Sequence, residues 1–127
     1  MIEFGQNLAV CKALAIARIN AASGLARQRY ITTSPGQDMI YIAKEREALA
    51  FLAASTDDLT TYPLLAAEVG VTALTAWELA QVWANVSVYW RAVAAQIEGV
   101  RMRALVQIET ASDPKAVTAV LAAFHPI

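Results

Sequence analysis

A helix-capping motif followed by a long proline-free stretch is the feature that most limits how this chain can fold. Thr75 and Glu78 have the spacing of a capping box, in which each side chain bonds a backbone amide left free at the start of a helix. No proline occurs from 76 to 110, which allows a helix of some 35 residues, roughly 50 Å long. Gly99 is the one position at which a kink or an earlier end of this helix is left open by the sequence.

Apolar residues recur along this predicted helix at alternating steps of four and three residues. They are Leu79, Trp83, Val86, Trp90, Val93, Ile97, Val100 and Ala104. Such a heptad seam is typical of a helix that packs against other helices along its length. We expect Trp83 and Trp90 to lie in the core of the bundle that results.

Composition extends this interpretation to the rest of the chain. Alanine is frequent, glycine and proline are few, and 57% of the 127 residues are hydrophobic, so a helix costs little at most positions. The sequence therefore predicts an all-α protein, a small helical bundle with one long helix in its C-terminal half and an N-terminal helix available for oligomerisation. The other helices are expected over 4–27, 35–54, 63–69 and 114–124.

Local signals set the ends of these shorter helices. Gly24 is expected to loosen or stop the first helix, Ser34 to cap the second, Gly70 to end the third in a left-handed conformation, and Asp113 to cap the last. The residues of the second helix expected to be buried are Ile40, Ala43, Leu49 or Ala50, and Phe51. Those expected to face water are Glu45, Arg46 and Glu47.

The apolar surplus indicates contact with other chains. A chain of 127 residues cannot cover both sides of a helix roughly 50 Å long with its own short helices. We therefore expect an N-terminal arm over 1–30, which oligomerises or docks, and a bundle domain over 31–127. The expected interface residues are Phe4, Leu8, Cys11, Leu14, Ile19, Arg27, Arg29 and Tyr30.

Several function classes are disfavoured by the residues. The stretch from Leu65 to Trp77 has helix-turn-helix spacing, but the next cation is Arg91, and a formal net charge of −1 gives little attraction to phosphate backbones. The single histidine, His125, has no nucleophile at a suggestive spacing. The adjacent carboxylates Asp57 and Asp58 diverge on a turn. We expect no catalysis, no cofactor, no metal and no nucleic-acid partner.

Membrane insertion is also not expected. The N-terminal stretch is apolar on average, but Glu3, Lys12 and Arg18 interrupt it, and no charged segment followed by an apolar one precedes a cleavage site. Elsewhere the longest apolar runs, such as 48–54, are too short to span a bilayer. The lone Cys11 cannot form an internal disulfide and is expected to be a small buried apolar residue.

One segment resembles small tail-associated proteins and tail-fibre regions of tailed bacteriophages. The resemblance is carried by an Arg-x-Arg-aromatic-Ile-Thr stretch that runs into Pro-Gly-Gln and then into Tyr, Lys and Glu-Ala at helical spacing. In this chain these are Arg27, Arg29, Tyr30, Ile31, Thr32, Pro35, Gly36, Gln37, Tyr41, Lys44, Glu47 and Ala48. Residues 62–68 and 111–113 look similar too, so that the likeness covers about 18–124.

The resemblance implies a non-enzymatic structural protein of the phage virion, located in the tail or tail-fibre apparatus and made in the host cytoplasm. Its expected partners are further copies of itself, for example in a trimer, and larger tail or fibre proteins. The alternative is a tail-fibre assembly chaperone that is absent from the finished particle. A helix-turn-helix regulator that binds DNA is the third hypothesis.

Overall fold

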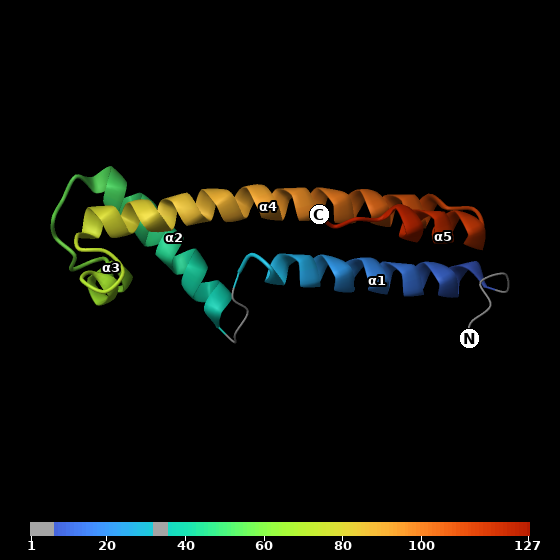
Figure 1. Cartoon of the computed structure of the whole chain (residues 1–127), viewed down its shortest axis with the longest axis horizontal. Coiled ribbons are helices and arrows are strands. Elements are labelled where there is room, and N and C mark those ends of the chain that lie inside the picture. Colours follow the sequence, from blue (N-terminus) through green and yellow to red (C-terminus); the bar gives the residue numbers. More distant parts are fainter. Residues whose placement is uncertain (1–6, 32–35) are drawn as a thin grey trace. The chain divides into compact units, whose positions relative to one another are not determined.

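The protein is an all-α chain in the computed structural model, which describes residues 7–31 and 36–127. The helices, in chain order, are α1 (Leu8–Gln28), α2 (Gln37–Ala54), α3 (Pro63–Glu68), α4 (Ala76–Thr110) and α5 (Pro114–Ala123) (Figure 1). The described residues form no strand, and one isolated bridge joins Val69 to Ala73. The predicted fold class, a small all-α bundle with one long helix, is confirmed.

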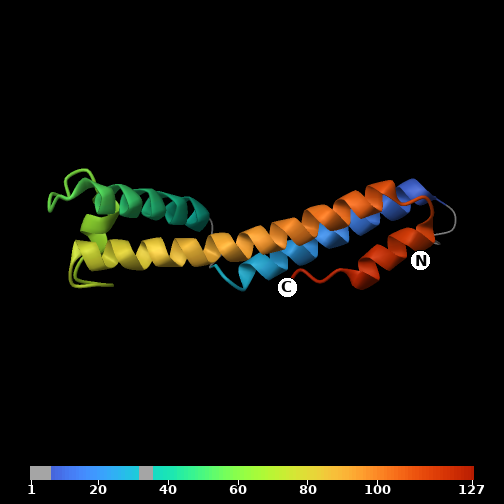
Figure 2. The same cartoon turned by 90° about the horizontal axis from the view of Figure 1, so that it is seen from above.

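The chain folds into two compact units that share α4. Unit 1 contains Met1–Ile31 and Ala92–Ile127, and unit 2 contains Thr32–Arg91. In unit 1, α1 and α5 both run antiparallel to the second part of α4 (Figure 2). This division differs from the predicted arm over 1–30 and bundle over 31–127, because α1 packs with the C-terminal end of the chain.

The core of unit 1 is formed by one face of α1, the last turns of α4 and α5. Its buried members are Cys11, Ala15, Ile19, Ala104, Ile108 and Val117. Polar contacts join the same helices, since Lys12 Nζ donates to the carbonyl oxygen of Glu109 at 2.7 Å and Arg101 Nη1 donates to Asn20 Oδ1 at 2.9 Å. The apolar face of α1 is therefore covered by other helices of the same chain.

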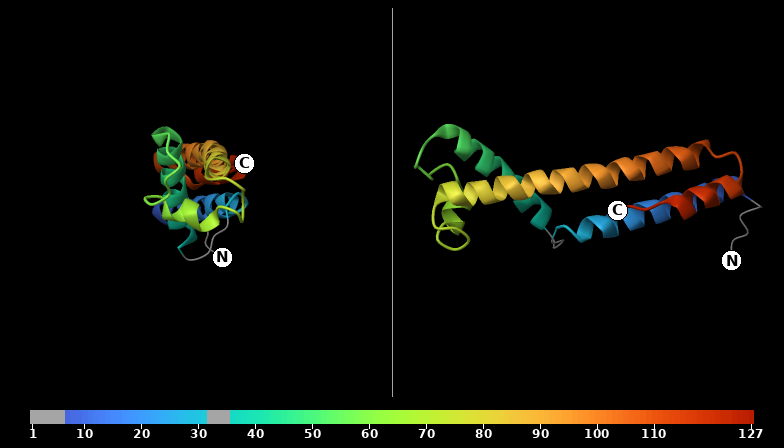
Figure 3. Two further views of the ribbon diagram at one scale, coloured as in Figure 1. Left: turned by 90° about the vertical axis from the view of Figure 1, so that its left-hand side faces the viewer. Right: turned by 45° about the horizontal axis from the view of Figure 1, so that its top comes forward.

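The core of unit 2 lies where α2 crosses the first part of α4 and α3 closes one end (Figure 3). Its buried members are Ala48, Phe51, Leu65, Leu79, Ala80 and Trp83. The ring of Phe51 meets that of Tyr62 edge to face, with 5.4 Å between the ring centres. Ile40, predicted to be buried, is exposed, and so are both Leu49 and Ala50, of which one was predicted to be buried, because Ala48 lies on the side of α2 that faces the core.

Several predicted helix ends are confirmed. Asp113 Oδ1 accepts a hydrogen bond from the backbone N–H of Ala116 at 2.8 Å, and Thr75 Oγ1 accepts one from the N–H of Glu78 at 3.1 Å. Gly70 has a φ of +88°, the left-handed conformation that glycine adopts without a steric cost. The helix α4 spans all 35 residues and passes through Gly99 without interruption.

Other predicted ends are wrong. The helix α1 begins at Leu8, because the side chain of Asn7 accepts a hydrogen bond from the N–H of Val10 at 3.1 Å. Gly24 does not stop it, and α1 ends at Gln28, next to the predicted end at Arg27. The helix α2 begins at Gln37, preceded by Gly36 with a φ of +80°. Phe4 and the proposed cap Ser34 lie outside the described residues.

Candidate functional site

A rigid turn between α3 and α4 holds three large apolar side chains in solvent. Val71, Leu74 and Trp77 are 81%, 83% and 60% exposed. The backbone beneath them is tied down, since the N–H of Gly70 donates to the carbonyl of Ala73 at 2.7 Å and the N–H of Val71 donates to the carbonyl of Glu68 at 2.9 Å. We name residues 69–77 the apolar turn. Exposed large apolar side chains on a hydrogen-bonded turn are typical of a protein-binding site.

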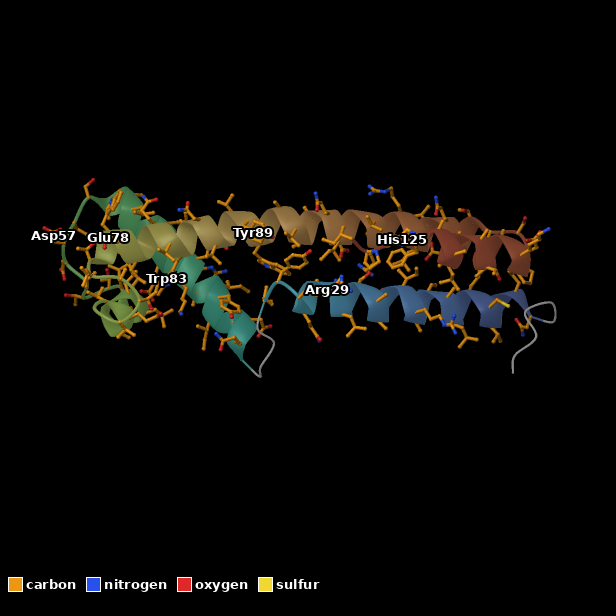
Figure 4. The ribbon with its side chains drawn as sticks, in the orientation of Figure 1. Arg29, Asp57, Glu78, Trp83, Tyr89 and His125 are labelled. Carbon is orange, nitrogen blue, oxygen red and sulfur yellow. The ribbon has the colours of Figure 1, made fainter. Side chains whose placement is uncertain are left out.

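A hollow of about 410 Å³ lies beside the apolar turn, at the end of unit 2. It is lined by Phe51, Leu52, Ser55, Thr56, Asp57, Thr75, Ala76 and Trp77, and we name it the end hollow. The carboxylates of Asp57 and Glu78 lie at this same end of the unit (Figure 4). No cation of the described residues forms an ion pair with either carboxylate, so this end of unit 2 has two acidic side chains without a cationic partner.

A network of polar contacts behind the apolar turn fixes α3 and α4 against α2. Lys44 Nζ lies 2.7 Å from Glu68 Oε2 and 4.9 Å from the ring centre of Trp83. Thr72 Oγ1 donates to Glu68 Oε1 at 2.7 Å, which connects the turn itself to the same carboxylate. The ammonium of Lys44 thus serves Glu68 as an ion-pair partner and Trp83 as a cation over its ring.

Two other carboxylates of α2 are also used within unit 2. Glu47 accepts hydrogen bonds from the backbone N–H groups of Leu64 and Leu65 at 3.0 and 3.2 Å, and so neutralises the positive N-terminal end of α3. Glu45 bonds to Ser87 and Arg91 on α4. The prediction that Glu45 and Glu47 face water is therefore wrong, because both residues are directed at neighbouring helices.

Acid is expected to weaken unit 2 through Glu68. The ion pair with Lys44, followed by the hydrogen bond from Thr72, lowers the pKa of Glu68 below its ordinary 4.5. The carboxylate therefore stabilises the fold above pH 4.5, and this contribution is lost as the pH falls through the lowered pKa. Thermal unfolding followed by circular dichroism from pH 7 to pH 3 measures the effect.

Glu68→Gln should decrease the acid dependence of the melting temperature, and Lys44→Met should decrease it in the same way, because each variant removes one partner of the pair. An acid dependence that stays unchanged in both variants would contradict the assigned role of Glu68.

The side of α1 that faces away from the core of unit 1 is apolar and cationic. Leu14, Arg18 and Leu25 are exposed along it, with the small residues Ala17 and Ala21 between them. We name these five residues the α1 outer face. The whole of α1 contains three cations and no Asp or Glu. No carboxylate of the described residues pairs with Arg18, so this cation remains open to a partner.

The structure separates the residues predicted to form an interface. Cys11 and Ile19 are 1% and 0% exposed in the core of unit 1, so neither is accessible to another chain, and Leu8 is half-buried against the same core. Leu14, Arg29 and Tyr30 are exposed, and Arg27 is half-buried. Leu14 is the member of the predicted set that belongs to the α1 outer face.

The aromatic residues of α4 also have different environments. Trp83 is buried as predicted, with 9% exposure, whereas Trp90 is half-buried and Val86 of the same seam is exposed. The seam is covered only in part because α2 lies over one side of α4 in unit 2. Trp77 is not part of the predicted seam, and this is the signal in the sequence that its side chain is not buried with Trp83.

The charges divide unequally between the two units. Unit 1 contains seven Lys and Arg and four Asp and Glu, for a formal net charge of +3. Unit 2 contains three Lys and Arg and seven Asp and Glu, for a formal net charge of −4. The chain as a whole has a formal net charge of −1, which hides this opposition. The two units therefore present surfaces of opposite sign.

The carboxylates beside the end hollow do not converge on one point. Asp58 Oδ1 accepts a hydrogen bond from the N–H of Thr60 at 2.9 Å, and bonds from Thr60 lower the pKa of Asp58. Asp57 instead lines the hollow. Within 7–31 and 36–127, no group of three His, Cys, Asp or Glu residues is arranged to hold a metal ion.

By length and composition, α1 meets the requirements for a membrane-spanning helix. It has 21 residues, and its most apolar window has a mean hydropathy of 1.4. Core helices of soluble proteins and signal sequences near an N-terminus meet the same requirements. In this structure one side of α1 packs in the core of unit 1.

Comparisons with protein-family models, with curated proteins and with solved structures found no match to this chain.

Proposed function

We propose that this chain is a non-enzymatic assembly protein that holds other protein chains together in the tail or tail-fibre apparatus of a tailed bacteriophage. The observation that carries the proposal is the exposure of large apolar side chains at the apolar turn, whose backbone is held by hydrogen bonds. Ordered, exposed apolar groups of this kind are the usual anchors of protein interfaces.

The phage context of the proposal rests on the resemblance of the segment 27–48 to tail-associated proteins. The charges at the end hollow support a protein partner over DNA, because the unpaired carboxylates of Asp57 and Glu78 would repel a phosphate backbone. The helix-turn-helix hypothesis predicts the opposite sign of charge at this turn.

We expect the purified chain to self-associate as its concentration rises. Multi-angle light scattering across a dilution series should give a molar mass near 13.7 kDa at low concentration and multiples of that mass at high concentration. A constant monomer mass, together with no binding to purified tail or fibre proteins, would contradict an assembly function.

Mass spectrometry of purified virions that encode this chain tests its place in the particle. A stoichiometric peptide signal supports a structural component. Its absence from virions, combined with binding to unassembled fibre protein, supports the assembly chaperone instead. Retention on DNA that falls steeply with salt would support the regulator and overturn both.

A further inference from the structure

We propose that copies of this chain associate head to tail, with the end hollow of unit 2 in one copy receiving the α1 outer face of unit 1 in the next. The inference rests on the proposed assembly function and deepens it, because it names a second copy of the chain as a partner. The predicted interface included Cys11 and Ile19, which are buried in the core of unit 1. The α1 outer face is an accessible surface on the other side of the same helix.

The opposite charges of the two units favour this contact. A symmetric contact between two copies of unit 2 would bring together two surfaces of net charge −4, and a contact between two copies of unit 1 would bring together two surfaces of net charge +3. A contact between unit 2 of one copy and unit 1 of another pairs a negative surface with a positive one. Such complementarity speeds encounter and suppresses the two like-charged alternatives.

The local chemistry of the two surfaces matches in the same way. On α1, the unpaired guanidinium of Arg18 lies one helical turn from Leu14 and on the same side of the helix as Leu25. At the end of unit 2, the hollow is lined by both apolar and polar side chains, among them Phe51, Trp77 and the unpaired Asp57, and Glu78 lies at the same end of the unit. A leucine side chain that enters the hollow would bring Arg18 to these carboxylates.

Trp77 adds a second reason for an arginine at this position. The indole lines the hollow and is 60% exposed, so its face can receive a planar guanidinium. An arginine can stack on an aromatic ring and form charged hydrogen bonds to a carboxylate at the same time. We therefore expect Arg18, Trp77 and Glu78 to dominate the affinity of the contact.

The proposed contact joins two different surfaces, and this determines how the assembly grows. Each copy presents both an end hollow and an α1 outer face, so a pair still has one free surface of each kind. Contacts of this type continue into closed rings or open filaments and do not stop at a dimer. The molar mass should therefore increase beyond two copies.

A lipid surface is the other class of partner that an apolar helix face can meet. The observations favour protein, because Arg18 lies within the outer face, between the exposed leucines, and an ion at that position is costly to bury among acyl chains. Co-sedimentation with phosphatidylcholine vesicles provides the corresponding arm of the test.

Charge reversal tests the proposal on the full chain. Glu78→Arg and Arg18→Glu should each weaken self-association about tenfold or more in sedimentation velocity at low salt, because each places like charges across the contact. An equimolar mixture of the two variants should associate again, because the unmodified outer face of Glu78→Arg fits the unmodified hollow of Arg18→Glu, and the two reversed surfaces are complementary to each other. This recovery from two inactive components would not follow from misfolding.

Matched controls have the same charge change elsewhere. Asp38→Arg removes an exposed acid from the first turn of α2, as Glu78→Arg does from α4, and Lys115→Glu reverses an exposed cation on α5. Both controls should associate like the unmodified chain.

The proposal is overturned if Glu78→Arg and Arg18→Glu associate normally, if their mixture does not recover, or if the unmodified chain stays monomeric. It is also overturned if the chain binds vesicles and Arg18→Glu and Glu78→Arg leave self-association unchanged. None of these outcomes decides whether the chain is a virion component, because the virion measurement is independent of self-association.

Discussion

Trp83→Ala is expected to lower the free energy of unfolding by about 3–5 kcal/mol, measured by urea denaturation followed by circular dichroism. Trp83 is 9% exposed and packs in the core of unit 2 with Phe51 and Leu79. The substitution removes a large apolar side chain, and it leaves a cavity that the surrounding helices cannot fill. It also removes the ring over which the ammonium of Lys44 lies at 4.9 Å.

Trp77→Ala is the matched control, because it makes the same change on the same helix at a residue that is 60% exposed. We expect a change in unfolding free energy within about 0.5 kcal/mol, as for most surface substitutions. Self-association should weaken in this variant, since Trp77 lines the end hollow. A loss below about 1 kcal/mol for Trp83→Ala would show that Trp83 is not part of the core.

Ile19→Ala is expected to destabilise the chain by about 2–5 kcal/mol. Ile19 lies on α1 and is fully buried against the other helices of unit 1, in the same cluster as Ile108 and Val117. If Ile19 were instead an interface residue, as the sequence predicted, its replacement would weaken association and leave the unfolding of the monomer almost unchanged. Denaturation at a concentration where the chain is monomeric distinguishes the two roles.

Leu25→Ala is the corresponding control on the other side of α1, where Leu25 is 63% exposed. This variant should retain the stability of the unmodified chain and lose affinity for a second copy. Equal destabilisation by Ile19→Ala and Leu25→Ala would mean that both sides of α1 are covered within the monomer, which would contradict the α1 outer face.

The long helix could be predicted from the sequence because its determinants are local. The Thr75 cap, the absence of proline and the repeated apolar steps all lie within the helix itself, and α4 has the predicted bounds. The same holds for α5, whose start is set by the cap at Asp113. The start of α1 was missed because Asn7, which supplies the cap, lies inside the predicted apolar periodicity, which begins at Phe4.

The arrangement of the helices could not be predicted, because it depends on contacts between distant parts of the chain. Lys12 bonds to the carbonyl of Glu109, which is 97 residues away, and α1 packs against α5. An apolar periodicity shows that a helix buries a face, but it does not show whether the covering helix belongs to the same chain. Cys11 and Ile19 were therefore assigned to an interface and lie in a core.

The end hollow and the charge opposition were missed for a related reason. Unit 1 is assembled from the two ends of the chain and unit 2 from its middle, so the two sets of charges cannot be counted until the fold assigns each segment to a unit. Asp57 and Glu78 are 21 positions apart in sequence and have no shared motif, yet they lie at the same end of unit 2 (Figure 4).

The inserted position of unit 2 has a consequence for how the chain is made. During translation α1 leaves the ribosome first, whereas α5, which packs against it, leaves last. At about 5–20 residues per second, synthesis of the intervening chain takes on the order of several seconds. Unit 2 is continuous in sequence and can fold during that interval. Until α5 has emerged, the side of α1 that faces the core of unit 1 lacks part of its packing surface and is exposed to solvent. A holdase that shields this helix until α5 has emerged would raise the yield of correctly folded protein.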